Sequence, residues 1–197
     1  MNTLNNNVRA SSRREVFDIL SSCMSGGTTP DMEQVESMYK YFMPKPTKAV
    51  KTPEQWAAQA CATKDIRESL HYLHVVSGVM YASDGHRMHF RPTEMGDGVY
   101  HPVTLAPILN CPKAPEFSRI IPKAGEYKSY RLEDCEEQFV EKYKRMQVSI
   151  GMVVLDKKYL SQATNNAKVV TLYINGPTDP VRGLCDFGEF VIMPIRR

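Results

Sequence analysis

The chain has 197 residues, of which 42% are apolar and 24% charged, which predicts one folded domain plus a small appendage and excludes a disordered, collagenous or coiled-coil protein. Its 25 basic and 22 acidic residues give a net charge of +3, so bulk charge does not indicate a nucleic-acid-binding protein, and any DNA contact should be local and weak. Its apolar runs are far shorter than the roughly 20 residues of a membrane span, and no signal peptide is visible, so we expect a soluble, cytoplasmic protein without a membrane partner.

The first predicted elements are two short helices. Apolar residues at helical spacing predict a helix over 12–23, which opens with a capping box, and a second helix over 29–42. The prolines that follow predict an extended linker. We therefore expect a helical N-terminal extension with its linker over 1–46 and a single main domain over 47–197.

The main domain begins with a predicted amphipathic helix of about three turns over 52–61, since a threonine cap and a proline open it. Residues 77–78 (Ser-Gly) are typical of a hairpin turn, and a strand begins after them and runs over 79–90. Residues 84–85 (Asp-Gly) interrupt that strand, and this dipeptide taken alone predicts a tight turn.

The rest of the domain repeats the order of a helix followed by strands. The Pro- and Gly-rich stretch 91–122 predicts a connector, and its part 106–122 separates two half repeats, about 47–105 and 123–197. Further strands are expected over 127–132, 146–154, 169–174 and 190–195, a helix capped by Asp156 over 156–165, and a solvated helix or a loop over 133–145. The fold class is therefore predicted to be α+β with an internal pseudo-repeat.

Motifs of catalysis are absent from the sequence. It contains no GxSxG, P-loop, HExxH or dinucleotide fingerprint. Its five cysteines are widely spaced and form no CxxC, which argues against a disulfide framework or a zinc ribbon. We expect no enzyme, no cofactor and no metal, while a metal-dependent enzyme that uses His86 and His89 stays open as a minor alternative.

Three local signatures carry more information: 82–88 (ASDGHRM), 115–122 (PEFSRIIP) and 191–196 (VIMPIR). Together they resemble the bacterial-type DNA sliding clamp, the beta subunit of DNA polymerase III, whose motifs occur in the same order. Echoes at 158–160 (KYL), 171–172 (TL) and 180–181 (PV) extend the resemblance over about 52–197. The resemblance implies a clamp-type domain, and it places Gly85 within or beside a strand, where a partner backbone can approach.

In the family, these signatures meet in one cleft that binds short peptides of polymerases and other replication proteins. The resemblance implies an apolar cleft wall that methionines make adaptable, stiffened by two prolines and rimmed by basic side chains. The implied cleft residues are Ser83, Gly85, His86, Arg87, Met88, Pro115, Arg119, Ile120, Val191, Met193, Pro194, Ile195 and Arg196.

The resemblance also implies loose contact with double-stranded DNA, without sequence specificity, through helices that line the inner face of a ring. The matching positions here are Lys64, Lys157, Lys158 and Gln162. A full family chain holds three domains, whereas this chain has room for one, so a ring of about six copies would have to close head to tail.

We therefore expect a reduced, single-domain and homo-oligomeric relative of the sliding clamp, of a kind that a phage or mobile element could encode. It would tether a replicative DNA polymerase to DNA as a processivity factor. The alternative is a clamp-like adaptor or inhibitor that does not encircle DNA and that binds the clamp clients or clamp loader of a host. The extension over 1–46 has no counterpart in the resemblance.

Overall fold

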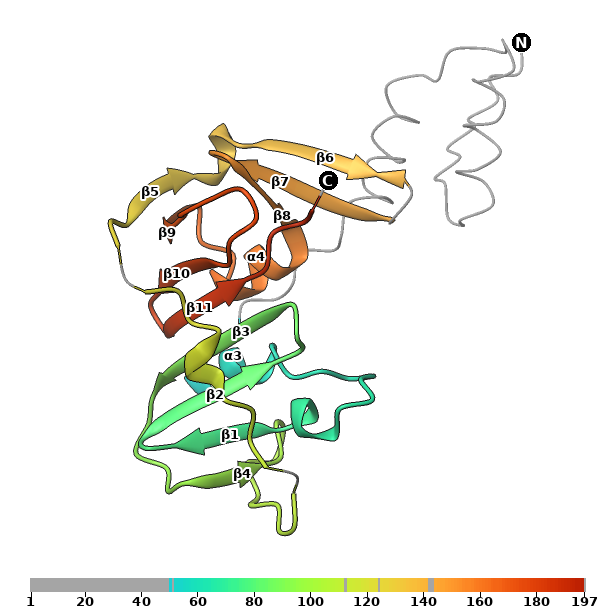
Figure 1. Cartoon of the computed structure of the whole chain (residues 1–197), viewed down its shortest axis with the longest axis vertical. Helices are drawn as coiled ribbons and strands as arrows, with labels where there is room; N and C mark the ends of the chain where they lie inside the picture. Colours follow the sequence, from blue (N-terminus) through green and yellow to red (C-terminus); the bar gives the residue numbers. More distant parts are fainter. Residues whose placement is uncertain (1–49, 51, 112, 124, 142–143, 197) are drawn as a thin grey trace, which may run out of the picture. The chain divides into compact units, whose positions relative to one another are not determined.

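Short antiparallel strands dominate the computed structural model (Figure 1). The structure describes residues 50, 52–111, 113–123, 125–141 and 144–196, which all belong to one compact unit, Pro46–Arg197. The helices expected over 12–23 and 29–42 lie outside the described residues. Within the described part of the chain, no helix is long and apolar enough to cross a membrane.

The helical segments are brief. The α-helices are α3 (Pro53–Ala58) and α4 (Lys157–Ala163), and the 3-10 turns are η1 (Glu68–His71), η2 (Phe117–Arg119) and η3 (Leu132–Asp134). The strands are β1 (Leu73–Val76), β2 (Val79–Ser83), β3 (Arg87–Pro92), β4 (Gly98–Tyr100), β5 (Lys128–Arg131), β6 (Glu136–Val140), β7 (Arg145–Ile150), β8 (Val153–Asp156), β9 (Val169–Tyr173), β10 (Val181–Cys185) and β11 (Gly188–Ile192).

Two antiparallel sheets organise these strands. The larger has eight strands in the order β4-β1-β2-β3-β11-β10-β9-β5, and the smaller has three in the order β6-β7-β8. The pairing of β3 with β11 joins strands that are far apart in the chain, so this contact connects the N-terminal and C-terminal halves of the unit. The predicted α+β class is confirmed.

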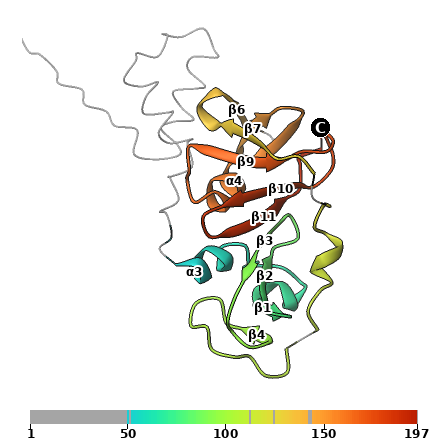
Figure 2. The ribbon, with the colours of Figure 1, turned by 90° about the vertical axis from the view of Figure 1, so that its left-hand side faces the viewer.

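The large sheet is covered differently on its two faces. Figure 2 shows α3 and α4 on one face, while the connector that carries η2 crosses the other. The main core lies on the helix side, where Trp56 of α3 stacks on His89 of β3 with ring centroids 4.4 Å apart. The indole Nε1 of Trp56 donates a buried hydrogen bond of 2.9 Å to the carbonyl of Ala163 in α4. This bond ties the two helices together.

The two helix caps predicted within the described part of the chain are present. The Thr52 side chain accepts from the Gln55 amide at 3.2 Å, and Asp156 accepts from the Lys158 amide at 2.9 Å. The helix expected over 52–61 is shorter than predicted, because α3 ends at Ala58 and the next amides bond three residues back.

The hairpin turn at 77–78 is confirmed, since both residues have positive φ between β1 and β2. Several other expectations were wrong. The stretch 133–145, expected to be a solvated helix or a loop, contains strand β6. The stretch 146–154, expected to be one strand, is a hairpin of β7 and β8 that turns at Gly151. The connector contains strand β4, and β10 was not expected at all.

Candidate functional site

An apolar cavity of about 190 Å³ lies at the ends of β2, β3 and β11. All three sequence signatures contribute to it, through Ser83, Gly85, His86, Arg87, Met88, Ile120, Val191 and Met193. We call it the apolar cavity. An apolar cavity of about 150 Å³ holds benzene, so this one has room for a large apolar side chain.

Strand register builds the floor of the apolar cavity. Met88 of β3 pairs with Ser83 of β2 on one side and with Val191 of β11 on the other, and residues paired in this way share a face of the sheet. All three are buried. His86 and Met193 lie two residues further along and continue the same face, and the Met193 amide donates to the His86 carbonyl at 2.8 Å.

The connector supplies Ile120 as one wall. Phe117 in η2 is buried and stacks on Tyr81 of β2, with ring centroids 4.9 Å apart and planes 6° from parallel. The Ile120 amide donates to the Phe117 carbonyl at 3.0 Å, while the Ile120 side chain remains 41% exposed. The aromatic anchor therefore holds Ile120 beside the cavity. Sequence reasoning placed Phe117 in a signature but did not identify this role.

Residues 84–85 form the turn between β2 and β3, as the dipeptide alone predicts. Gly85 has a φ of +86°, a conformation that favours glycine. Gly85 lies directly beside β2 and β3, as the resemblance implies, and a Cβ at this position would lie 2.5 Å from the nearest nitrogen of the Arg67 guanidinium. The positive φ of this turn is therefore the reason that a glycine is favoured here.

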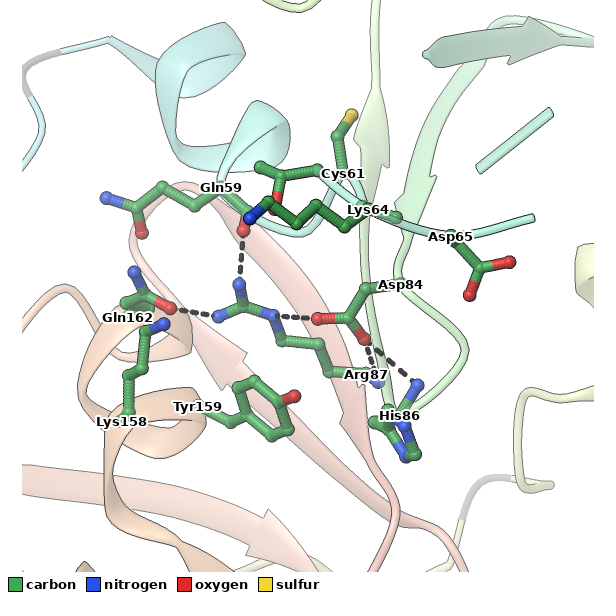
Figure 3. Close-up of a pocket in the computed structure, with 12 residues that line it drawn as sticks. Gln59, Cys61, Lys64, Asp65, Asp84, His86, Arg87, Lys158, Tyr159 and Gln162 are labelled. Carbon is green, nitrogen blue, oxygen red and sulfur yellow. Dashed lines mark hydrogen bonds and ion pairs between the residues drawn. The ribbon is translucent and has the colours of Figure 1, made fainter. Parts of the chain in front are cut away.

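Arg87 lines the apolar cavity, but its guanidinium does not form a basic rim there, because the charged group lies on the helix side of the sheet (Figure 3). There its Nε donates to Asp84 at 3.1 Å, and its other nitrogens donate to the Gln162 side chain and the Gln59 carbonyl. The guanidinium carbon also lies 4.6 Å from the centre of the Tyr159 ring. Burial lowers the pKa of Arg87, and the charge of Asp84 opposes that shift.

Side-chain alternation explains this orientation. Met88 points to the cavity face, so the adjacent Arg87 must point to the other face. The sequence analysis did not identify Gln59, Asp84 and Tyr159 as partners of Arg87. Asp84 could have been found, since it lies three residues before the arginine across a tight turn.

The remaining predicted cleft residues do not line the apolar cavity. They are Pro115, Arg119, Pro194, Ile195 and Arg196. Arg119 is largely exposed and pairs with Glu116 at 2.5 Å. The Ile195 amide donates to the Val154 carbonyl of β8 at 2.8 Å, which directs the tail toward the smaller sheet.

A second, polar cavity of about 410 Å³ lies on the helix side of the large sheet (Figure 3). Three of the residues expected to contact DNA line it, namely Lys64, Lys158 and Gln162. The fourth, Lys157, instead forms an ion pair with Glu137. We call this cavity the polar pocket.

The histidines expected for a metal-dependent enzyme lie in different surroundings, one buried in the core and the other exposed in the turn between β2 and β3. His89 is fully buried, and its Nδ1 lies 2.8 Å from the Trp56 carbonyl, whereas His86 lines the apolar cavity. No group of three potential metal ligands occurs among the described residues. Burial also raises the pKa of the Cys61 thiol to about 12, so this cysteine is not a ready nucleophile.

Comparison with known proteins identifies the fold. No family model and no curated protein matches the chain. Among solved structures, it is similar to the beta sliding clamp of Caulobacter crescentus, with a TM-score of 0.54 and 12% sequence identity over 74% of this chain and 62% of the clamp. The fold is that of a sliding clamp.

Two further clamps support this conclusion. The DNA polymerase III beta chain of Streptococcus pneumoniae has a TM-score of 0.53 and 12% identity over 73% of this chain and 62% of its own. A griselimycin-bound clamp of Pseudomonas aeruginosa has a TM-score of 0.52 and 13% identity over 74% and 63%. The match therefore spans less than two thirds of the length of these clamps.

Proposed function

We propose that this chain is a clamp-like processivity factor that tethers a DNA polymerase through a short client peptide and catalyses no reaction. One observation carries the proposal. The three signatures that resemble the clamp cleft come together around one apolar cavity, which lies in a sliding-clamp fold. The proposed role is tested by the partners that the chain binds.

The chemistry of the apolar cavity fits an apolar peptide side chain. Met88 and Val191 form a buried floor, while Ile120 and Met193 are partly exposed walls. Methionine is flexible and polarizable, so the cavity can adapt to several related side chains. Among the similar clamps, one carries griselimycin, and another binds polyethylene glycol at a region proposed for motif tethering.

The proposal includes loose contact with double-stranded DNA by the helix side of the unit. Lys64 and Lys158 are exposed there and lie near Gln162. Exposed ammonium groups attract the phosphate backbone without reading its sequence. A single clamp-type domain of two half repeats would need several copies to surround DNA, so we propose a homo-oligomer.

Light scattering on the full chain over a concentration series tests the processivity role. A ring predicts an oligomer whose mass holds on dilution, together with retention on circular DNA that is lost when the DNA is linearised. A monomer that still binds client peptides would contradict the ring and favour the clamp-like adaptor or inhibitor. A protein that binds neither peptide nor DNA would contradict both proposals.

A further inference from the structure

The polar pocket contains more positive charge than the surrounding carboxylates balance. Two carboxylates line it, those of Asp65 and Asp84. Asp65 is held by both oxygens to Arg67, at 2.9 Å each, and this hydrogen bonding lowers the pKa of Asp65 far below its usual range. Asp84 pairs with Arg87 and accepts from two backbone amides. Each carboxylate is therefore already neutralised by a guanidinium.

Two ammonium groups remain. Lys64 and Lys158 both line the polar pocket and are exposed, and neither has an ion-pair partner among the residues that the structure describes. They come from different elements, the loop after α3 and the first turn of α4. In Figure 3 both side chains extend toward the side of the pocket where Gln59 and Gln162 lie. The pocket thus carries an uncompensated charge of about two.

Gln162 adds an oriented donor. Its Oε1 accepts from Arg87, and since a glutamine amide has a separate NH₂ group, two N–H donors remain for another ligand. A phosphoryl group matches this set, because it carries one or two negative charges and several acceptor oxygens. The volume of about 410 Å³ leaves room for a pyrophosphate or a nucleotide phosphate.

We propose that the polar pocket is a phosphate-binding site, in which Lys64 and Lys158 hold a phosphoryl group beside Gln162. The group is either a small phosphate compound or part of a nucleic acid. Binding of a small phosphate compound does not depend on the proposed processivity role, whereas binding of a nucleic-acid phosphate rests on that role. The neighbouring Lys157 is not part of the site, because it is paired with Glu137.

The test uses inorganic pyrophosphate as the probe, titrated into the full chain by calorimetry at constant ionic strength. We expect saturable binding that Lys64→Met and Lys158→Met each weaken about tenfold or more, the usual effect of one charge-assisted hydrogen bond. Lys157→Met is the matched control and should change the affinity less than twofold. Absence of saturable binding, or an equal loss in Lys157→Met, would overturn the proposal.

Competition with a DNA duplex distinguishes the two sources. Displacement of pyrophosphate by the duplex, weakened in the Lys64→Met and Lys158→Met variants, would support a nucleic-acid phosphate. Retention of pyrophosphate in the presence of duplex would support a small phosphate ligand. Peptide binding to the apolar cavity, measured on the same variants, should be unchanged. A loss of peptide binding there would show damage to the fold and overturn the assignment of these lysines to the pocket.

Discussion

Replacing Arg87 with methionine should lower the free energy of unfolding more than replacing an exposed charged residue does. The Arg87 side chain is only 5% exposed, and its partner Asp84 is 15% exposed. Methionine keeps the length of the stem but removes the guanidinium, so Asp84 loses its counter-charge. The Gln59 carbonyl and the Gln162 side chain lose their donor in the same step.

The magnitude follows from these contacts. Removing one partner of a buried ion pair costs about 3–5 kcal/mol. Asp84 keeps hydrogen bonds of 2.9 and 3.0 Å from the amides of His86 and Arg87, and water can enter the polar pocket, so we expect the lower end, about 3 kcal/mol. In a unit of this size, that loss lowers the melting temperature by roughly 6–12 °C.

Urea unfolding followed by circular dichroism measures this loss. Arg119→Met is the matched control, because Arg119 is 79% exposed and pairs with an exposed Glu116, so its free energy of unfolding should change by no more than about 1 kcal/mol. The buried-pair explanation also predicts that adding Asp84→Asn to Arg87→Met costs little more. A loss below about 1 kcal/mol in Arg87→Met would refute the reasoning.

Three further predictions follow from the core, all measured by urea unfolding. Burial lowers the pKa of His89 from 6.5 to about 3, so on acidification the unfolded chain takes up a proton before the folded chain does. The contribution of His89 to the free energy of unfolding is therefore present above about pH 6.5 and falls by about 2 kcal/mol between pH 6.5 and 5. Equal free energies of unfolding at pH 5 and pH 7 would contradict this. A Cβ added at Gly183 would lie 2.2 Å from the ring of Phe190, so Gly183→Ala should cost about 1–3 kcal/mol, whereas Gly96→Ala, whose nearest contact is 3.9 Å away, should stay within about 0.5 kcal/mol. Trp56→Phe removes the buried hydrogen bond between α3 and α4 and should lower the free energy of unfolding by about 1–3 kcal/mol. An unchanged midpoint of urea unfolding would show that this bond does not stabilise the unit.

Local signals predicted the local elements well. The Asp156 cap, the turn at 77–78 and the turn at 84–85 each depend on residues that are adjacent in the sequence, and all three are present. The Asp-Gly pair is instructive, because the general chemistry of the dipeptide predicted the turn, while the resemblance placed its glycine beside a strand, and both statements agree with the structure. Its glycine is favoured because the turn requires a positive φ.

Strands that form mainly by pairing with another strand were missed. Strand β6 has a polar sequence with exposed residues and forms because it pairs with β7, and β4 forms by pairing with β1. Neither carries the alternation of apolar residues that predicts a strand. Pairing with another strand supplies the hydrogen bonds that the residues of these strands do not indicate by themselves.

The candidate site, too, could be predicted from the sequence only in part. Signatures from three parts of the chain indicated which residues meet, and eight residues of these signatures surround the apolar cavity. The direction of each side chain was less well predicted, although the two-residue period of a strand separates Arg87 from Met88. The tail residues beyond Met193 could not be placed from sequence, because their path depends on the contact of Ile195 with β8.

Peptide binding to the apolar cavity is the most direct test of the account. The measurement is the fluorescence anisotropy of a labelled peptide with the apolar tail of a clamp-binding polymerase, titrated with the full chain. We predict saturable binding that Met193→Ala weakens about tenfold. The matched control is Met152→Ala, which alters an exposed methionine of the β7–β8 turn and should bind as the unaltered chain does. Equal affinities of the Met193→Ala and Met152→Ala variants would contradict the assignment of the apolar cavity as the client site.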